Sequence, residues 1–234
     1  MSAALTVFKK ELKGFFFSPI AYIVITMFLL LSGWFFFSTF FLYNQAELRT
    51  FFTQLPLIFT FIIPAVTMRL FSEELNTGSF ELLATLPVSG SGIVIGKFLA
   101  ALTFIALMLL PTLAYAFSVS LLGDLDLGPV IGGYCGALLL AGAYTGIGLL
   151  ASSITRNQII AFILGMALCL VLTIFDRMLF FVPESMLAVF AYLGSTAHFQ
   201  NIARGIIDTR DLIYFLSLIF LALYGTAFVL QEKA

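Results

Sequence analysis

The chain has 234 residues, of which 62% are hydrophobic and 10% are charged, and its formal net charge is −1. A soluble domain has roughly 25% charged residues and about half apolar ones, so this composition excludes a soluble protein and predicts an integral membrane protein. The small net charge gives no field that would attract a nucleic acid. Cys135 and Cys169 lie inside apolar runs, with no spacing typical of a disulfide or a metal site.

The first predicted element is an amphipathic helix over residues 3–17. A helix with one basic and one apolar face is typical of a segment that lies in the membrane interface. Lysines before an apolar run are also typical of a signal peptide, but the run that follows is long and has no small-residue cleavage site, so we expect the segment to be retained. At helical spacing, the apolar face has Leu5, Phe8, Leu12, Phe15 and Phe16, and the polar face has Thr6, Lys9, Lys10 and Lys13.

Six apolar stretches are each long enough to cross a bilayer core of ~30 Å, which needs about 20 helical residues. Residues 177–210 differ, because their apolar run is short and polar residues follow it. They predict two short half-inserted or interfacial helices, since such backbone is tolerated only where protein or water covers it. The fold class is therefore all-α, a single polytopic transmembrane domain over residues 1–234. The expected spans are 20–43, 52–71, a span within 94–122, 130–152, 158–176 and 212–230.

The fourth span is rich in small residues. Gly132 and Gly136 form one pair at a spacing of four, and Gly142 and Gly146 form another. Such pairs allow two helix backbones to approach closely. The alternative is that these glycines only provide local flexibility.

The stretch between the second and third spans, residues 69–97, is the most polar connection near the middle of the chain. At helical spacing its polar and apolar residues separate, and Pro87 stops the pattern. We predict an amphipathic helix over residues 72–87 that lies at the membrane surface and offers its polar side to a partner in the water. The alternative is a loop that only satisfies helix ends. The polar side has Glu74, Thr77, Gly78, Glu81 and Thr85, and the apolar side has Leu75, Leu82, Leu83 and Leu86.

Six spans place both termini on the same side of the membrane. Cytoplasmic loops are enriched in Lys and Arg, and the side of the termini has seven of the 11 Lys and Arg residues. We therefore expect both termini and the loop of residues 69–97 to be cytoplasmic. The seven are Lys9, Lys10, Lys13, Arg69, Lys97, Arg156 and Lys233, and the other side has Arg49, Arg177, Arg204 and Arg210.

Catalytic, cofactor-binding and metal-binding residues are not expected in this chain. Ser195 and His198 lie one helical turn apart, but no third group is suggested to orient them, so a polar re-entrant turn explains them more simply. No Walker-type phosphate loop is present, and no ionisable residue lies near the centre of a span. Any energy for transport is therefore expected to come from outside the chain.

The loop of residues 69–97 resembles the signature of ABC-2 permeases, the membrane subunits of type-2 ABC exporters: acidic-Thr-Gly-x-x-Glu-Leu-Leu-x-x-x-Pro, ending in Gly-Lys. The resemblance covers essentially the whole chain. These permeases have an N-terminal interface helix, six spans, a coupling helix after the second span and two short extracellular helices after the fifth. The size and the SEELNTGSFELLATLPVS segment resemble permeases of gliding motility and of copper maturation for nitrous-oxide reductase. The signature residues are Arg69, Glu73, Glu74, Thr77, Gly78, Glu81, Leu82, Leu83, Leu86, Pro87, Gly96 and Lys97.

The resemblance implies a separate ABC ATPase subunit that binds ATP, a second permease copy in a homo- or heterodimer, and a bacterial or archaeal cytoplasmic (inner) membrane. We expect Glu73, Glu74 and Glu81 to make polar contacts with the ATPase, within a coupling segment that includes Thr77 and Gly78. Lys9, Lys10 and Lys13 of the interface helix would contact either the ATPase or only anionic lipid. The remaining coupling residues, Leu82, Leu83 and Leu86, would anchor the helix to the membrane side, and Pro87 would end it.

Three functions compete at this point. The first is the permease subunit of an ATP-driven exporter, coupled through the loop of residues 69–97. The second is a membrane anchor or assembly subunit of an ATPase-driven machine, such as a gliding-motility complex, that moves no substrate. The third is an intramembrane enzyme acting on lipid, which the missing catalytic constellation disfavours. The cargo cannot be predicted from the sequence.

Overall fold

The computed structural model describes residues 3–43, 48–80, 90–123, 125–178, 192–206 and 208–233. These residues contain helices and no strand, and six helical segments among them are long and apolar enough to cross a membrane. The all-α polytopic fold is thus confirmed. The elements are α1 (Ala3–Phe17), α2 (Pro19–Tyr43), α3 (Arg49–Thr67), α4 (Arg69–Thr77), α6 (Gly90–Leu109), a 3₁₀ turn (Leu110–Thr112), α7 (Leu113–Leu122), α8 (Leu127–Ile154), α9 (Gln158–Met178), α11 (Ser195–Ala203) and α12 (Thr209–Gln231).

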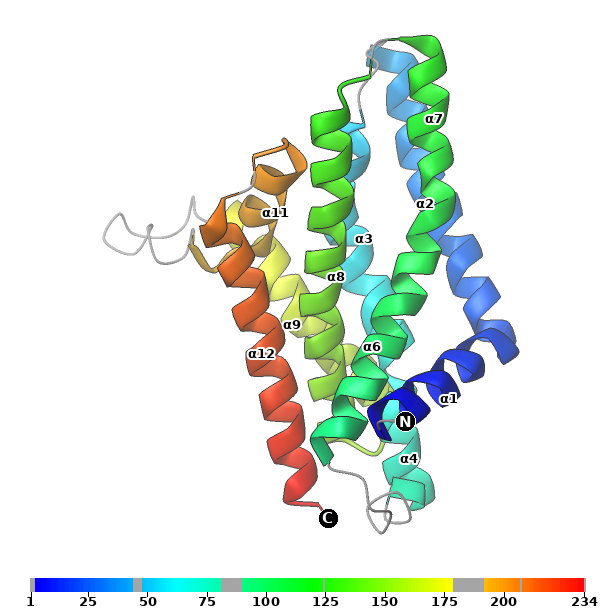
Figure 1. Cartoon of the computed structure of the whole chain (residues 1–234), viewed down its shortest axis with the longest axis vertical. Helices are drawn as coiled ribbons and strands as arrows, with labels where there is room; N and C mark the ends of the chain where they lie inside the picture. The colour runs from blue at the N-terminus through cyan, green and yellow to red at the C-terminus, as the bar shows by residue number, and fades with distance from the viewer. Residues whose placement is uncertain are drawn as a thin grey trace.

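Both termini lie at the same end of the bundle, and α1 crosses that end (Figure 1). Lys233 Nζ donates hydrogen bonds to the carbonyl oxygens of Ser153 at 2.8 Å and Ile154 at 2.9 Å, at the C-terminal end of α8. Burial, and then the charge of Arg156, lower the pKa of Lys233 from its ordinary value. The C-terminus and the α8–α9 connection therefore share this end of the molecule.

Helix α1 has the predicted amphipathic character. Phe15 is buried and Phe8, Leu12 and Phe16 pack against the core, while the polar face, with its three lysines, is exposed. Leu5 is the exception, because 40% of it is exposed. Ser18 separates α1 from α2, and its hydroxyl accepts a hydrogen bond from the Ile20 N–H at 3.3 Å, as an N-cap residue does.

Helix α8 lies at the centre of the bundle (Figure 1). In its apolar span 78% of the residues are buried inside the chain, against 22% in α2, α9 and α12. A Cβ added at Gly132 would lie 2.3 Å from the Ile202 carbonyl oxygen of α11, and one added at Gly146 would lie 3.0 Å from the Ala222 Cβ of α12. Both predicted glycine pairs therefore serve close packing, one against α11 and the other against α12.

The third span bends within its length. Pro111 lies in the 3₁₀ turn that separates α6 from α7. A proline lacks the N–H that the helix needs and clashes with the preceding turn, which accounts for the change of helix type at this residue.

The segment 177–210 contains α11, one short helix of the kind predicted there. The second predicted short helix would fall on residues 179–191, outside the described part of the chain. Ser195 and His198 both lie on α11 but have different partners: the Ser195 hydroxyl lies 2.7 Å from the Tyr144 hydroxyl, and His198 Nδ1 lies 2.5 Å from Asp211 Oδ1. The alternative of a Ser–His dyad is therefore not supported by this geometry.

Candidate functional site

Helix α4 follows α3 after a single turn residue, Met68. It extends beyond α1 at the end of the bundle where the termini lie (Figure 1). The prediction of one helix over residues 72–87 is wrong at its start and in its continuity, whereas its predicted end at Pro87 falls outside the described part of the chain. The helix begins at Arg69 and ends at Thr77, because Gly78 adopts the left-handed conformation with φ of 72° that glycine commonly provides after a helix.

A side chain from the central helix holds the junction of α3 and α4. The Ser152 hydroxyl of α8 accepts hydrogen bonds from the N–H groups of Phe71 and Ser72, both at 3.0 Å, and donates to the Met68 carbonyl oxygen at 2.7 Å. A side chain inserted at such a place is a recognised cause of a helix interruption. The base of α4 is therefore tied to α8 by a buried hydroxyl group.

Lys97 of α6 is the best-buried cation of the described residues, with 1% of its side chain exposed. Its Nζ donates to the Leu70 carbonyl oxygen at 2.7 Å, to Glu74 Oε1 at 2.8 Å and to Glu11 Oε1 at 3.0 Å. An ammonium group has three N–H donors, so these three acceptors satisfy it completely. Lys97 thereby connects α6 to α4 and to α1, and we call Glu11, Glu74 and Lys97 the Lys97 cluster.

Packing explains why Glu11 reaches Lys97. A Cβ added at Gly96 would lie 2.8 Å from the Ala4 carbonyl oxygen and 2.9 Å from the Val7 Cβ. Only glycine lets the backbone of α1 pass this close to α6. The close approach places the next two turns of α1, with Glu11, beside the buried end of Lys97.

The cluster has more negative than positive charge, since two carboxylates share one ammonium. Lys10 Nζ lies 3.9 Å from both Glu11 Oε1 and Glu74 Oε1 and is 66% exposed, so it adds a solvated positive charge at the rim. Glu74 Oε2 is buried and has no hydrogen-bond partner among the described residues. A hollow of about 340 Å³ opens beside the cluster, between α1, α4 and α6.

Arg69 makes a second connection between α4 and the start of the chain. Its guanidinium lies 5.1 Å from the centre of the Phe15 ring, and its Nη1 donates to the Ser18 hydroxyl at 3.4 Å. A cation over an aromatic face is attracted by the ring quadrupole. Two cationic side chains, Arg69 and Lys97, thus hold α4 against α1 and α6.

Residues 5–230 match the model of the ABC-2 family transporter proteins. The chain belongs to this family. A comparison with curated protein sequences gave no match. Proteins of the ABC-2 family are membrane components of ABC transporters, and they generally work with an ABC ATPase partner. The molecule is therefore a multi-pass ABC-2 permease.

The predicted coupling residues of this ABC-2 permease lie in different environments. Glu73 and Thr77 are exposed on α4, as expected of a docking surface. Glu74 was expected to face water, and this is wrong: its side chain is only 14% exposed and its Oε1 is paired with Lys97. Pairing inside the chain outweighs the helical pattern that placed Glu74 on the polar side. Five further predicted residues fall outside the described residues: Glu81, Leu82, Leu83, Leu86 and Pro87.

Sequence reasoning missed the two residues that complete the site. Glu11 was not singled out, although it is the one acidic residue in the sequence of α1. Ser152 is only the last residue of the fourth expected span, and nothing in its local sequence indicates that it binds α4. A useful signal was present at Gly96-Lys97, where a small residue precedes a lysine at the edge of an apolar run. The described residues contain no group of three or more His, Cys, Asp or Glu side chains that could hold a metal ion.

Proposed function

We propose that this ABC-2 permease is the membrane subunit of an ATP-driven exporter and that a separate ABC ATPase, which binds the ATP, docks on α4 and on the segment that follows it. The docking surface includes Glu73, Thr77 and Gly78, and extends to the residues of the signature beyond α4. Movement of α4 is passed to α6 and α1 through the Lys97 cluster. The single observation that carries this proposal is the buried contact of Lys97 with Glu74 and Glu11.

The contacts of α4 determine which helices move with it. Breaking a buried ion pair by removing one partner costs about 3–5 kcal/mol, so α4 cannot leave α6 without a large loss of stability. Ser152 holds the base of α4 and Lys97 holds its middle. A force applied to the exposed side of α4 therefore moves the third span and the interface helix together with it.

The orientation follows from the distribution of charge. We propose that both termini, α1 and α4 face the cytoplasm of a bacterial or archaeal cell, since Lys and Arg are enriched on that side of membrane proteins. The exposed lysines of α1, Lys9, Lys10 and Lys13, would then contact anionic lipid or the ATPase. A second permease copy would complete the transporter, as a homo- or heterodimer.

The variant Glu11→Gln tests the coupling role. The amide keeps the size of the side chain and an acceptor oxygen, and Lys97 keeps its pairing with Glu74, so the permease should fold and bind its ATPase. We expect the change in ATPase rate caused by the permease to fall by about fivefold or more, the lower end of typical allosteric couplings. The measurement is ATP hydrolysis by the purified complex in lipid nanodiscs, with Glu232→Gln as the control because Glu232 is exposed at the same end of the chain.

Three results would contradict the proposal. If the Glu11→Gln permease changes the ATPase rate as much as the unchanged protein does, the Lys97 cluster does not transmit movement. If Glu11→Gln and Glu232→Gln reduce the change in ATPase rate equally, the reduction is a general effect of removing a negative charge. Failure of the complex to assemble in Glu11→Gln alone would place Glu11 in docking instead of transmission.

A further inference from the structure

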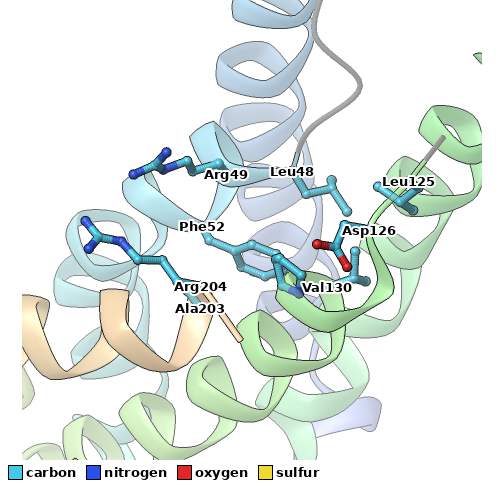
Figure 2. A pocket seen from close by; sticks show the side chains of 9 residues that line it. Leu48, Arg49, Phe52, Leu125, Asp126, Val130, Ala203 and Arg204 are labelled. Carbon is cyan, nitrogen blue, oxygen red and sulfur yellow. The ribbon is translucent and has the colours of Figure 1, made fainter. Parts of the chain in front are cut away.

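Two adjoining hollows lie at the end of the molecule away from the termini, near the start of α3 and the end of α11. Figure 2 shows the larger one, which the start of α8 also lines. Their volumes are about 360 and 230 Å³. Arg49, Phe52 and Arg204 line both of them. The coupling site described above does not involve these residues.

The two arginines point the same way. Arg49 is the first residue of α3 and Arg204 directly follows α11, yet both guanidinium groups lie on one side of the Phe52 ring, while the Asp126 carboxylate lies on the other side (Figure 2). Asp126 Oδ1 accepts a hydrogen bond from the Gly128 N–H at 3.0 Å and so caps the start of α8. Neither guanidinium forms an ion pair with a described residue. Two like charges that have no ion-pair partner among the described residues repel each other.

Glycines fix the backbone that holds these side chains. A Cβ added at Gly133 would lie 2.3 Å from the Phe52 ring, and Gly132 packs against the Ile202 carbonyl oxygen at the end of α11. Gly205 follows Arg204 with φ of 84°, a conformation that other residues rarely adopt. Tight packing therefore holds Phe52 and Arg204 in place. Because these residues are already ordered, a ligand that binds them loses little free energy in ordering them.

From this geometry we propose that the smaller hollow, between α3 and α11, binds a phosphate group. Two guanidinium forks bind phosphate oxygens with paired hydrogen bonds. Thr53 and Gln200 line the same hollow and add neutral polar groups. Leu48 is the N-cap residue of α3, and its side chain cannot accept a hydrogen bond. The N–H groups of the first turn of α3 have no capping side chain and therefore also favour an anion.

The hollow lies where two of the apolar spans begin, the level at which we expect lipid headgroups. Arg49 begins the second span, and Arg204 lies shortly before the sixth span begins at Thr209. The phosphate group can thus come from the phosphodiester of an anionic phospholipid or from a phosphate-bearing solute, since both present the same oxygens. The test below separates these two sources.

The test uses the full-length permease with two probes. Retention of phosphatidylglycerol over phosphatidylcholine is measured by native mass spectrometry, and protection by inorganic phosphate over chloride at equal ionic strength is measured by thermal unfolding in a neutral detergent. The variants are Arg49→Gln, Arg204→Gln and the double variant. Arg210→Gln is the matched control, because Arg210 is exposed near α11 but does not line the hollow.

We expect binding to weaken about tenfold for each guanidinium lost, the loss expected for one charge-assisted hydrogen bond, and to stay unchanged in Arg210→Gln. An effect on the lipid probe alone identifies a headgroup site, and an effect on both probes identifies a site for soluble phosphate as well. If the double variant binds both probes as the unchanged chain does, the proposal is wrong. It is equally wrong if Arg210→Gln weakens binding as much as the variants in the hollow. Circular dichroism confirms that each variant is folded.

Discussion

His198 and Asp211 form a buried hydrogen-bonded pair. His198 Nε2 lies 2.9 Å from the Tyr192 carbonyl oxygen. Its Nδ1 lies 2.5 Å from Asp211 Oδ1. The His198 ring also stacks on Tyr214, with centroids 4.1 Å apart. The pair joins α11 to the start of α12.

Removal of the histidine is therefore expected to harm the fold more than neutralisation of the aspartate. His198→Phe leaves the Asp211 carboxylate buried without a partner, at a cost of about 3–5 kcal/mol. Asp211→Asn keeps a hydrogen bond to the ring and places no unpaired charge in the interior. Thermal unfolding of the two variants in detergent should rank them in this order. The reverse order would mean that Asp211 is held by groups other than His198.

At the scale of elements, α4 owes its position to α8. The N–H groups of Phe71 and Ser72 both depend on the Ser152 hydroxyl, which lies 81 and 80 residues away along the chain. Ser153, the next residue, is equally buried, but among the described residues its hydroxyl bonds only to the Leu150 carbonyl oxygen of its own helix. The two neighbouring serines thus have the same burial and different roles.

This difference gives a matched pair of variants. Ser152→Ala removes a partner from two N–H groups and one carbonyl oxygen, and an unsatisfied buried group costs about 1–3 kcal/mol. We expect the amide hydrogens of Phe71 and Ser72 to exchange faster in Ser152→Ala than in the unchanged chain. In Ser153→Ala they should exchange at the rate of the unchanged chain. Hydrogen–deuterium exchange with mass spectrometry measures it directly. If both variants exchange as the unchanged chain does, Ser152 does not hold α4 in place.

At the scale of the whole molecule, these cationic side chains lie in two groups at opposite ends of the bundle. Lys97, Arg69 and Lys233 lie with the termini, and Arg49 and Arg204 lie together at the opposite hollows. The positive-inside rule supplies the expected direction, with the termini and α4 in the cytoplasm.

Single cysteines test this direction. In a chain with Cys135 and Cys169 replaced by serine, we expect an impermeant thiol reagent added to intact cells to label Arg204→Cys. Lys13→Cys and Thr77→Cys should be labelled only after the cells are made permeable. Labelling of Thr77→Cys in intact cells would reverse the orientation, and α4 could then not meet an ATPase in the cytoplasm.

Local patterns were sufficient for much of the fold. The lengths of the apolar runs predicted six spans, the spacing of lysines and phenylalanines predicted α1, and the glycine pairs of the fourth span predicted close packing at Gly132 and Gly146. These properties follow from residues within a few turns of each other, because helical periodicity and the thickness of a bilayer are the same wherever the segment lies.

The sequence by itself determined the number of spans, the amphipathic character of α1 and the side on which the cations gather. Only the tertiary structure decided that Glu74 turns inward, that Lys97 meets Glu11 across 86 residues of chain, and that Arg49 and Arg204 share a hollow. The physical reason is distance along the chain. A buried charge selects whichever opposite charge the packed helices bring within hydrogen-bond reach, and a glycine such as Gly96 sets that approach without leaving any charge pattern in the sequence.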